Sequence, residues 1–137
     1  MIKNFKLQQG AIASTVAHDS HNIIAVGTDN ESLATAVNAL IDHRGGLCVT
    51  TAGLTKVLPL PVAGLMSTGS CDEIGHQYAA IEAEVKAMGC DLRAPFMTLS
   101  FMALLVIPRL KLSDHGLFDG TAFAFTSVQP DSEPAPA

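Results

Sequence analysis

Positive charge is scarce in this 137-residue sequence. It holds 8 lysines and arginines against 13 aspartates and glutamates, and its formal net charge is -5. The cations form no basic patch along the chain. Because proteins bind nucleic acids mainly by neutralising phosphates with lysine and arginine, we expect no nucleic-acid partner.

Long hydrophobic runs are also missing, although 48% of the residues are hydrophobic. The longest run, residues 97–108, ends in a proline and is shorter than the roughly 18–20 apolar residues of a membrane span. We therefore expect no membrane contact. Residues 1–6 lack the apolar stretch of a secretory signal, which predicts a cytoplasmic protein. A chain this apolar either packs tightly or loses part of its surface to a partner.

Paired cysteines and phosphate-binding glycine motifs are absent as well. Cys48, Cys71 and Cys90 are odd in number and widely spaced, which excludes a disulfide framework and a zinc site. We expect them to be buried or half-buried free thiols. The glycines at 45–46 and 64 belong to no nucleotide-binding pattern.

What the sequence does contain is a regular succession of strands and helices. Runs of small and β-branched residues predict strands, and apolar residues at helical spacing predict helices. The predicted strands are residues 11–17, 22–28, 47–51 and 54–60, and the predicted helices are about 30–43 and 71–88. The strand at 22–28 is continuously apolar, so we expect it to be buried on both faces.

The remaining segments are less regular. An apolar crossing at 58–67, interrupted by prolines, is expected to lie against a neighbour. Residues 96–107 could form either a buried helix or a strand. A polar turn is predicted at 111–118 and a last strand at 121–128.

The order β-β-α-β-β-α, an apolar segment and a closing β predicts an α+β domain. Its sheet would be mostly antiparallel and covered on one side by two helices. The domain would span residues 10–128, after an N-terminal arm at 1–9. Residues 129–137, rich in proline, predict a disordered tail.

A cluster of five polar residues separates the first two predicted strands. It consists of His18, Asp19, Ser20, His21 and Asn22. Such a cluster is too polar to bury without partners, and its apolar flanks are too strand-like for a floppy loop. It predicts a rigid polar turn that faces a ligand or a partner.

The chemistry of this turn has several interpretations. His18 and His21 could bind a metal only with further ligands, which the spacing does not offer, so we predict no metal site. Ser20 lacks the flanking glycines of a nucleophile elbow. A turn held by its own hydrogen bonds and a site completed by another domain both stay open. Asp114 and His115, in a second tight turn, are secondary candidates.

Four stretches of the chain resemble the C-terminal domain of bacterial adenine deaminase. They are residues 10–27, 58–67, 95–101 and 112–119, and they agree with that family in order and spacing. The resemblance covers about residues 8–128, nearly the whole predicted domain.

The resemblance implies a role in purine metabolism. The family hydrolyses a cyclic amidine C–N bond, converting adenine and water to hypoxanthine and ammonia, and belongs to the amidohydrolase superfamily. Its catalytic (β/α)8 barrel holds a two-metal centre, of Mn or Fe, that activates water. A barrel takes about 250 residues, so we expect none in this chain and no activity from the chain alone.

On this interpretation the chain is an accessory domain. Its partners would be an amidohydrolase barrel domain or subunit and, in the assembled enzyme, adenine; a homo-oligomer is compatible with this. The polar turn at 18–22 would face the barrel mouth and order the substrate pocket or the surroundings of the metals. The chain could be a fragment, a split subunit or a relic with a new role. The alternative function is a free-standing small binding or interaction module without catalytic activity.

Overall fold

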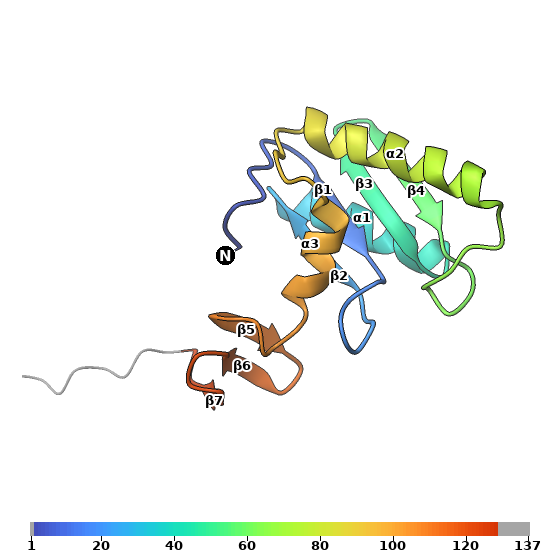
Figure 1. The fold of residues 1–137 in the computed structure, drawn as a ribbon. Coiled ribbons are helices and arrows are strands. Elements are labelled where there is room, and N and C mark those ends of the chain that lie inside the picture. Colours follow the sequence, from blue (N-terminus) through green and yellow to red (C-terminus); the bar gives the residue numbers. More distant parts are fainter. Residues whose placement is uncertain (1, 129–137) are drawn as a thin grey trace, which may run out of the picture.

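The computed structural model describes residues 2–128 (Figure 1). The predicted tail at 129–137 lies outside the described residues. The elements in order are β1 (Ala11–Ser14), β2 (Ile24–Gly27), α1 (Asn30–Asp42), β3 (Gly46–Thr51), β4 (Leu54–Pro59), α2 (Cys71–Ala87), α3 (Pro95–Met102), β5 (Leu110–Ser113), β6 (Gly116–Asp119) and β7 (Ala124–Thr126). The predicted α+β class, the antiparallel pairing and the order of the first six elements are confirmed.

The main sheet has the strand order β2-β1-β3-β4, and every pair in it is antiparallel. Strand β1 lies inside the sheet, and its Ile12 pairs with Val26 on one side and Val49 on the other. All four residues of β1 are buried. A strand that is buried along its whole length must be covered on both faces of the sheet.

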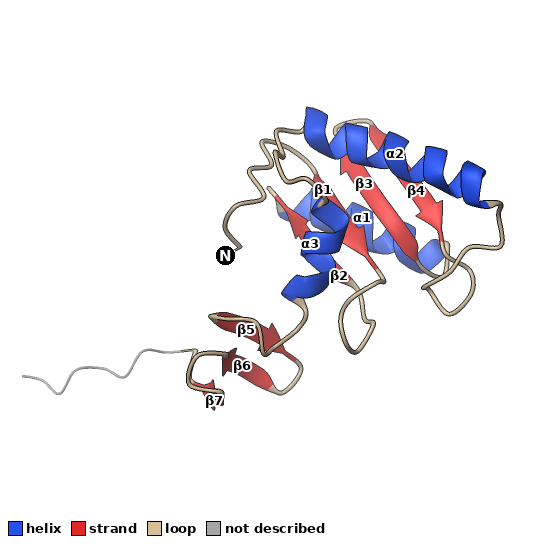
Figure 2. Ribbon diagram, in the orientation of Figure 1, coloured by secondary structure: helices blue, strands red, loops and turns tan. Residues whose placement is uncertain are grey.

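Helices cover both faces, so the expectation of cover on one side only is wrong (Figures 1 and 2). On one face the small side chains Ala11 and Ala13 pack against Leu40 of α1. On the other, Ile12 packs in the larger core cluster with residues of α2 and α3, among them Val85 and Leu99. Alternate residues of a strand point to opposite faces, so this split follows directly from the β1 sequence.

Strand β2 is an edge strand and half-buried throughout, so the expectation that it is buried on both faces is also wrong. No strand pairs with its outer side in the described residues. Its first residue, Ile24, instead borders two open hollows, described below.

The helix starts agree with the sequence. Asp29 accepts a hydrogen bond from the backbone N–H of Ser32 at 2.7 Å and caps α1. Ser70 and Glu73 form a reciprocal capping box at the start of α2. None of the helices within residues 2–128 is long and apolar enough to cross a membrane.

The ambiguous segment begins as helix α3, with Pro95 in its first turn, and buries Phe96, Leu99 and Ser100. It leads into a second antiparallel sheet, β5-β6-β7. The prediction of a polar turn over 111–118 is wrong in extent, because these residues form a hairpin whose turn is Asp114-His115. The last predicted strand is confirmed only over β7.

Two further segments close the main domain. In the predicted apolar crossing, Thr15 Oγ1 donates to the carbonyl of Gly64 at 2.6 Å, while Val62 and Met66 stay exposed. In the predicted arm, Phe5 is buried in the larger core, and the N–H of Gln8 donates to the carbonyl of Met88 at 2.9 Å.

Candidate functional site

The polar cluster lies in the loop between β1 and β2 and is anchored by its backbone. The N–H of His18 donates to the carbonyl of Ser100 in α3 at 3.0 Å, and the N–H of His21 donates to the carbonyl of Ala17 at 2.7 Å. His21 adopts a left-handed conformation, with φ 45°. The first bond fixes the backbone of the loop to α3, and the second closes a turn within the loop itself.

The side chains of the cluster differ in exposure. His18 is half-buried, and its ring centroid lies 4.7 Å from that of Phe101 in α3. The ring of His21 is exposed, 5.9 Å from the ring of His18. Asp19, Ser20 and Asn22 are exposed. The loop therefore presents an imidazole, a carboxylate, a hydroxyl and an amide to solvent.

One secondary candidate joins the loop in space. Asp114, at the tip of the β5–β6 hairpin, lines a hollow of about 340 Å³ together with Ser20 and Asn22. Its other lining residues are mostly apolar and include Met102 of α3 and Leu112 of β5. His115 is not among the residues that line this hollow, and its ring lies 6.4 Å from that of Phe125 in β7.

The donor set of the loop does not fit a metal site. Within residues 2–128 no three side chains of His, Cys, Asp or Glu converge to hold an ion. Zinc and related ions need three or four protein ligands, and the loop supplies only two imidazoles. The two imidazoles would therefore need ligands from another domain to hold an ion.

The loop also lacks the arrangement of a nucleophile. The hydroxyl of Ser20 is contacted by the amide of Asn22, at 3.5 Å, and not by an imidazole. A serine nucleophile needs a base within hydrogen-bond reach. What the loop can do is bind and orient a polar group brought to it.

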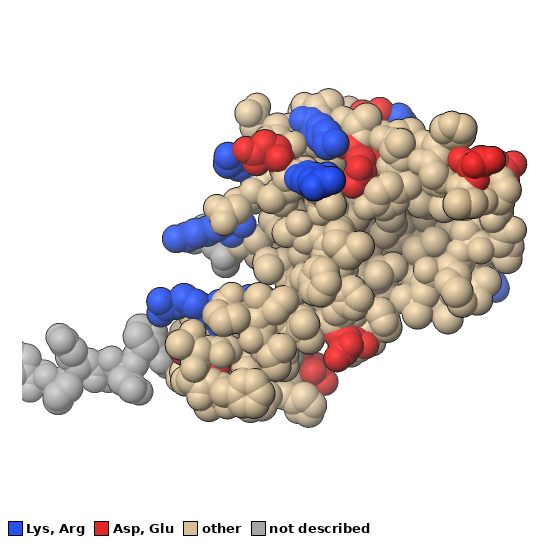
Figure 3. Space-filling view, in the orientation of Figure 1, with Lys and Arg blue, Asp and Glu red and all other residues tan. Residues whose placement is uncertain are grey.

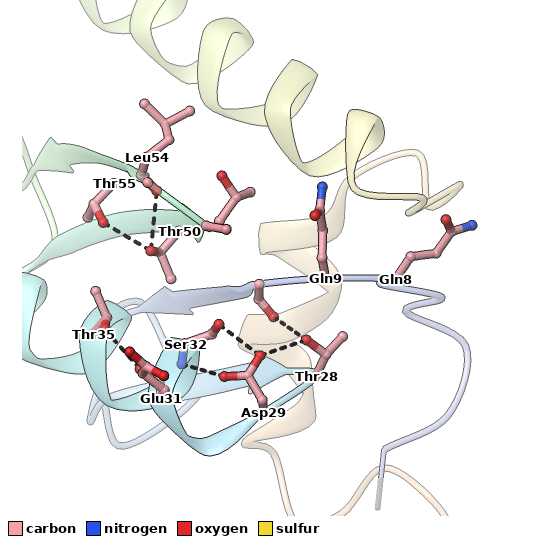
Figure 4. Close-up of a pocket in the computed structure, with 14 residues that line it drawn as sticks. Gln8, Gln9, Thr28, Asp29, Glu31, Ser32, Thr35, Thr50, Leu54 and Thr55 are labelled. Atoms are coloured by element: carbon pink, nitrogen blue, oxygen red, sulfur yellow. Dashed lines mark hydrogen bonds between the residues drawn. The ribbon is translucent and has the colours of Figure 1, made fainter.

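A second polar hollow, which the sequence did not indicate, lies at the opposite end of the sheet (Figure 4). It measures about 700 Å³, and six of its fourteen lining residues bear hydroxyl groups, from the strand ends and from α1. Several of these side chains already form hydrogen bonds with one another, as Figure 4 shows. The hydroxyls of Thr50 and Thr55 are 2.9 Å apart, and the hydroxyl of Ser32 donates to the carboxylate of Asp29 at 2.9 Å. The hydrogen bonds from Ser32 lower the pKa of Asp29. This hollow is a helix cap and a strand turn rather than a prepared binding site.

Residues 1–124 match the sequence family described as the adenine deaminase C-terminal domain. The chain is 54% identical over 127 residues to the adenine deaminase of Methanosarcina barkeri, covering 93% of this chain and 23% of that protein. It is 56% identical over 125 residues to the adenine deaminase of a Sulfurovum species, covering 90% of this chain and 24% of that protein. The chain thus spans about a quarter of the length of the curated relatives it matches.

Proposed function

This chain belongs to the family of adenine deaminase C-terminal domains, and we propose that it is the accessory domain of an enzyme that hydrolyses adenine to hypoxanthine and ammonia. Identity above 50% to proteins named adenine deaminase supports the reaction. The small share of those proteins that it matches supports an accessory role. Catalytic machinery, including a water-activating metal centre of Mn or Fe, would come from the remainder of the enzyme.

We further propose that the polar turn at 18–22 faces the catalytic domain and contributes to the substrate pocket. The observation that carries this is how the turn is anchored. The hydrogen bonds that hold the turn join backbone groups: the N–H groups of the turn donate to the carbonyls of Ser100 and Ala17. The side chains of Asp19 and His21 therefore stay exposed. Polar side chains that serve only to hold a turn commonly bond to the backbone of that turn.

The exposed groups suit a heterocycle such as adenine. A carboxylate accepts hydrogen bonds from an exocyclic amine, and a neutral imidazole can donate to one ring nitrogen or accept from a ring N–H. Loop residues on a rigid scaffold are common in binding sites because the scaffold holds their geometry. Asp19 and His21 would therefore orient the substrate and exclude water, while the bond-breaking chemistry takes place on the partner domain.

A chimera tests this proposal. Residues 1–124 of this chain would replace the matching region of the Methanosarcina barkeri enzyme, and adenine deamination would be measured with Mn or Fe added. We expect an active chimera and an inactive isolated chain. His21→Ala and Asp19→Ala should each lower kcat/KM about 10- to 100-fold, the cost of losing substrate positioning.

The matched control is His76→Ala, which removes an exposed histidine of α2 far from the turn along the chain. It should leave kcat/KM unchanged. Robust deamination by the isolated chain would contradict an accessory role. If both turn variants behave like the parent chimera, the turn is structural. A fully inactive chimera with an intact fold would favour the free-standing binding module.

A further inference from the structure

One face of the small sheet carries leucines that are largely exposed in the described part of the chain, residues 2–128. Leu112 of β5 pairs with Leu117 of β6, so the two share a face, and Leu110 lies two residues from Leu112 on that same face. Leu110 is 52% exposed and Leu112 is 74% exposed. Three-stranded sheets need a buried apolar face to be stable, so an uncovered one indicates a missing neighbour.

These leucines form one wall of a groove of about 760 Å³. The opposite wall contains Ile2 of the N-terminal segment, Ile24 of β2 and Met102 of α3. Ile2 is 47% exposed although it lies beside this apolar space. Both walls thus carry apolar side chains, and the space between them can take an inserted chain segment.

The groove continues into the hollow beside the polar turn. Ile24, Met102 and Leu112 line both spaces. A chain segment that fills the groove would therefore end next to Ser20 and Asp114. The two together form one continuous surface.

The groove carries positive charge on a chain whose net charge is negative. Its lining includes three basic residues, Lys3, Arg109 and Lys111. No aspartate or glutamate is among the described residues that line it. Lys111 is 9% exposed, and its ammonium group donates to the carbonyls of Ile107 and Pro108. Figure 3 shows lysine and arginine on the side of the molecule where the N-terminal segment and the small sheet lie. An occupant with apolar side chains and flanking carboxylates would complement this groove.

We propose that the groove is the docking site for a segment of the upstream part of the same enzyme, one with apolar side chains flanked by aspartate or glutamate. This rests on the proposed function. The curated relatives are about four times longer than the matched region, and the family is described as a C-terminal domain. In a C-terminal domain the rest of the enzyme precedes the matched region, here residues 1–124, and Ile2, near the start of that region, lines the groove.

Hydrogen–deuterium exchange on the isolated chain and on the chimera compares identical residues in the two states. We expect amides of residues 97–118 to exchange at least about tenfold more slowly in the chimera, because docking suppresses local opening. Amides of β3 and β4 at 47–58 should exchange equally in both. Equal exchange over 97–118, in a chimera that deaminates adenine, would overturn the docking site while leaving the proposed function intact.

A variant pair sharpens the test. Leu112→Asp places a carboxylate on an exposed position of the groove, so the isolated chain should unfold as the parent does while the chimera loses its protection over 97–118. Ile41→Asp, at a 57% exposed position of α1 across the main sheet, should leave that protection unchanged. Concentration-dependent self-association of the isolated chain, abolished by Leu112→Asp, would assign the groove to a second copy and overturn the proposal.

Discussion

The backbone N–H of His18 and the carbonyl of Ser100 are 3.0 Å apart, and this hydrogen bond joins the β1–β2 turn to helix α3. Ser100 is buried, and its hydroxyl donates to the carbonyl of Met97 one turn back in the helix. The position of the polar turn therefore depends on the packing of α3 against the sheet. A substitution in α3 should therefore alter the position or the mobility of the turn.

Phe101→Ala should loosen the turn without unfolding the domain. Phe101 is partly exposed, and its ring packs against the ring of His18. Losing this contact should cost about 0.5–1.5 kcal/mol in the free energy of unfolding, measured by urea denaturation. Amide exchange over residues 17–22 should accelerate. Met97→Ala, at another exposed apolar position of α3, should change neither quantity as much.

Leu99→Ala should destabilise the whole domain. Leu99 is fully buried in the core cluster that contains Ile12 of β1 and Val85 of α2. Truncating a buried leucine to alanine typically costs about 2–5 kcal/mol, because the cavity collapses only in part. The urea midpoint should fall accordingly. A loss below 1 kcal/mol, on the order of a surface change, would mean that α3 is not part of the cooperative core.

The features that follow from local sequence were predictable. The sequence indicates Asp29 or Asn30 as the cap of the first helix and Ser70, Cys71 or Asp72 as the cap of the second. In the structure the caps are Asp29 and Ser70. The placement of helices on both faces of the sheet could not be predicted from the sequence. Alanine packs well against a helix, but Ala11 and Ala13 carry too little hydrophobic signal to show that their face is covered.

Contacts between distant segments could not be read from the sequence either. The β5–β6 hairpin has only short runs of alternating leucines, so its polar turn dominated the pattern. Asp114 and Ser20 line the same hollow because of the way the small sheet is placed after α3. No local sequence pattern specifies that placement. Composition and spacing therefore indicated the polar turn itself but not the hollow beside it.

The stability of the domain should fall in acid partly through Asp29. Hydrogen bonds from Ser32 and Thr28 lower the pKa of Asp29 below its ordinary value of 3.8. A carboxylate with a lowered folded-state pKa contributes stability that is complete above the unfolded-state pKa. That stability is lost as the pH falls through the folded-state value.

Asp29→Asn keeps a good capping side chain but does not titrate. We expect the variant to lose less stability than the parent as the pH falls from about 5 to below 3.8, the ordinary value of the group. Urea midpoints across this range measure the difference. Parallel curves for the two proteins would contradict a contribution from this cap.

The three cysteines should differ in reactivity. Burial raises the pKa of the Cys48 thiol to about 11, and Cys90 is also buried. Cys71 is exposed at the first residue of α2, which corrects the expectation that all three are buried or half-buried. Because the thiolate is the reactive form, iodoacetamide at pH 8 should label Cys71 alone in the folded protein. Mass spectrometry of Cys71→Ser should then show no rapid labelling, and rapid labelling of Cys48 would contradict its buried position.

Lys111→Met should release the small sheet while leaving the main sheet intact. The Lys111 ammonium donates to the carbonyls of Ile107 at 2.9 Å and Pro108 at 3.4 Å, and so holds the segment that connects α3 to β5. Methionine has a similar length but no donor, so two carbonyls lose a charged partner, at a local cost of about 1–3 kcal/mol. Limited proteolysis between residues 103 and 110 should accelerate, while the urea midpoint reported by far-UV circular dichroism should change little.

Lys3→Met, which removes an exposed cation of the same groove, controls for the loss of charge and should leave the proteolysis rate unchanged. Equal acceleration in both variants would show that charge in the groove, rather than the bonds of Lys111, sets the stability of the connection.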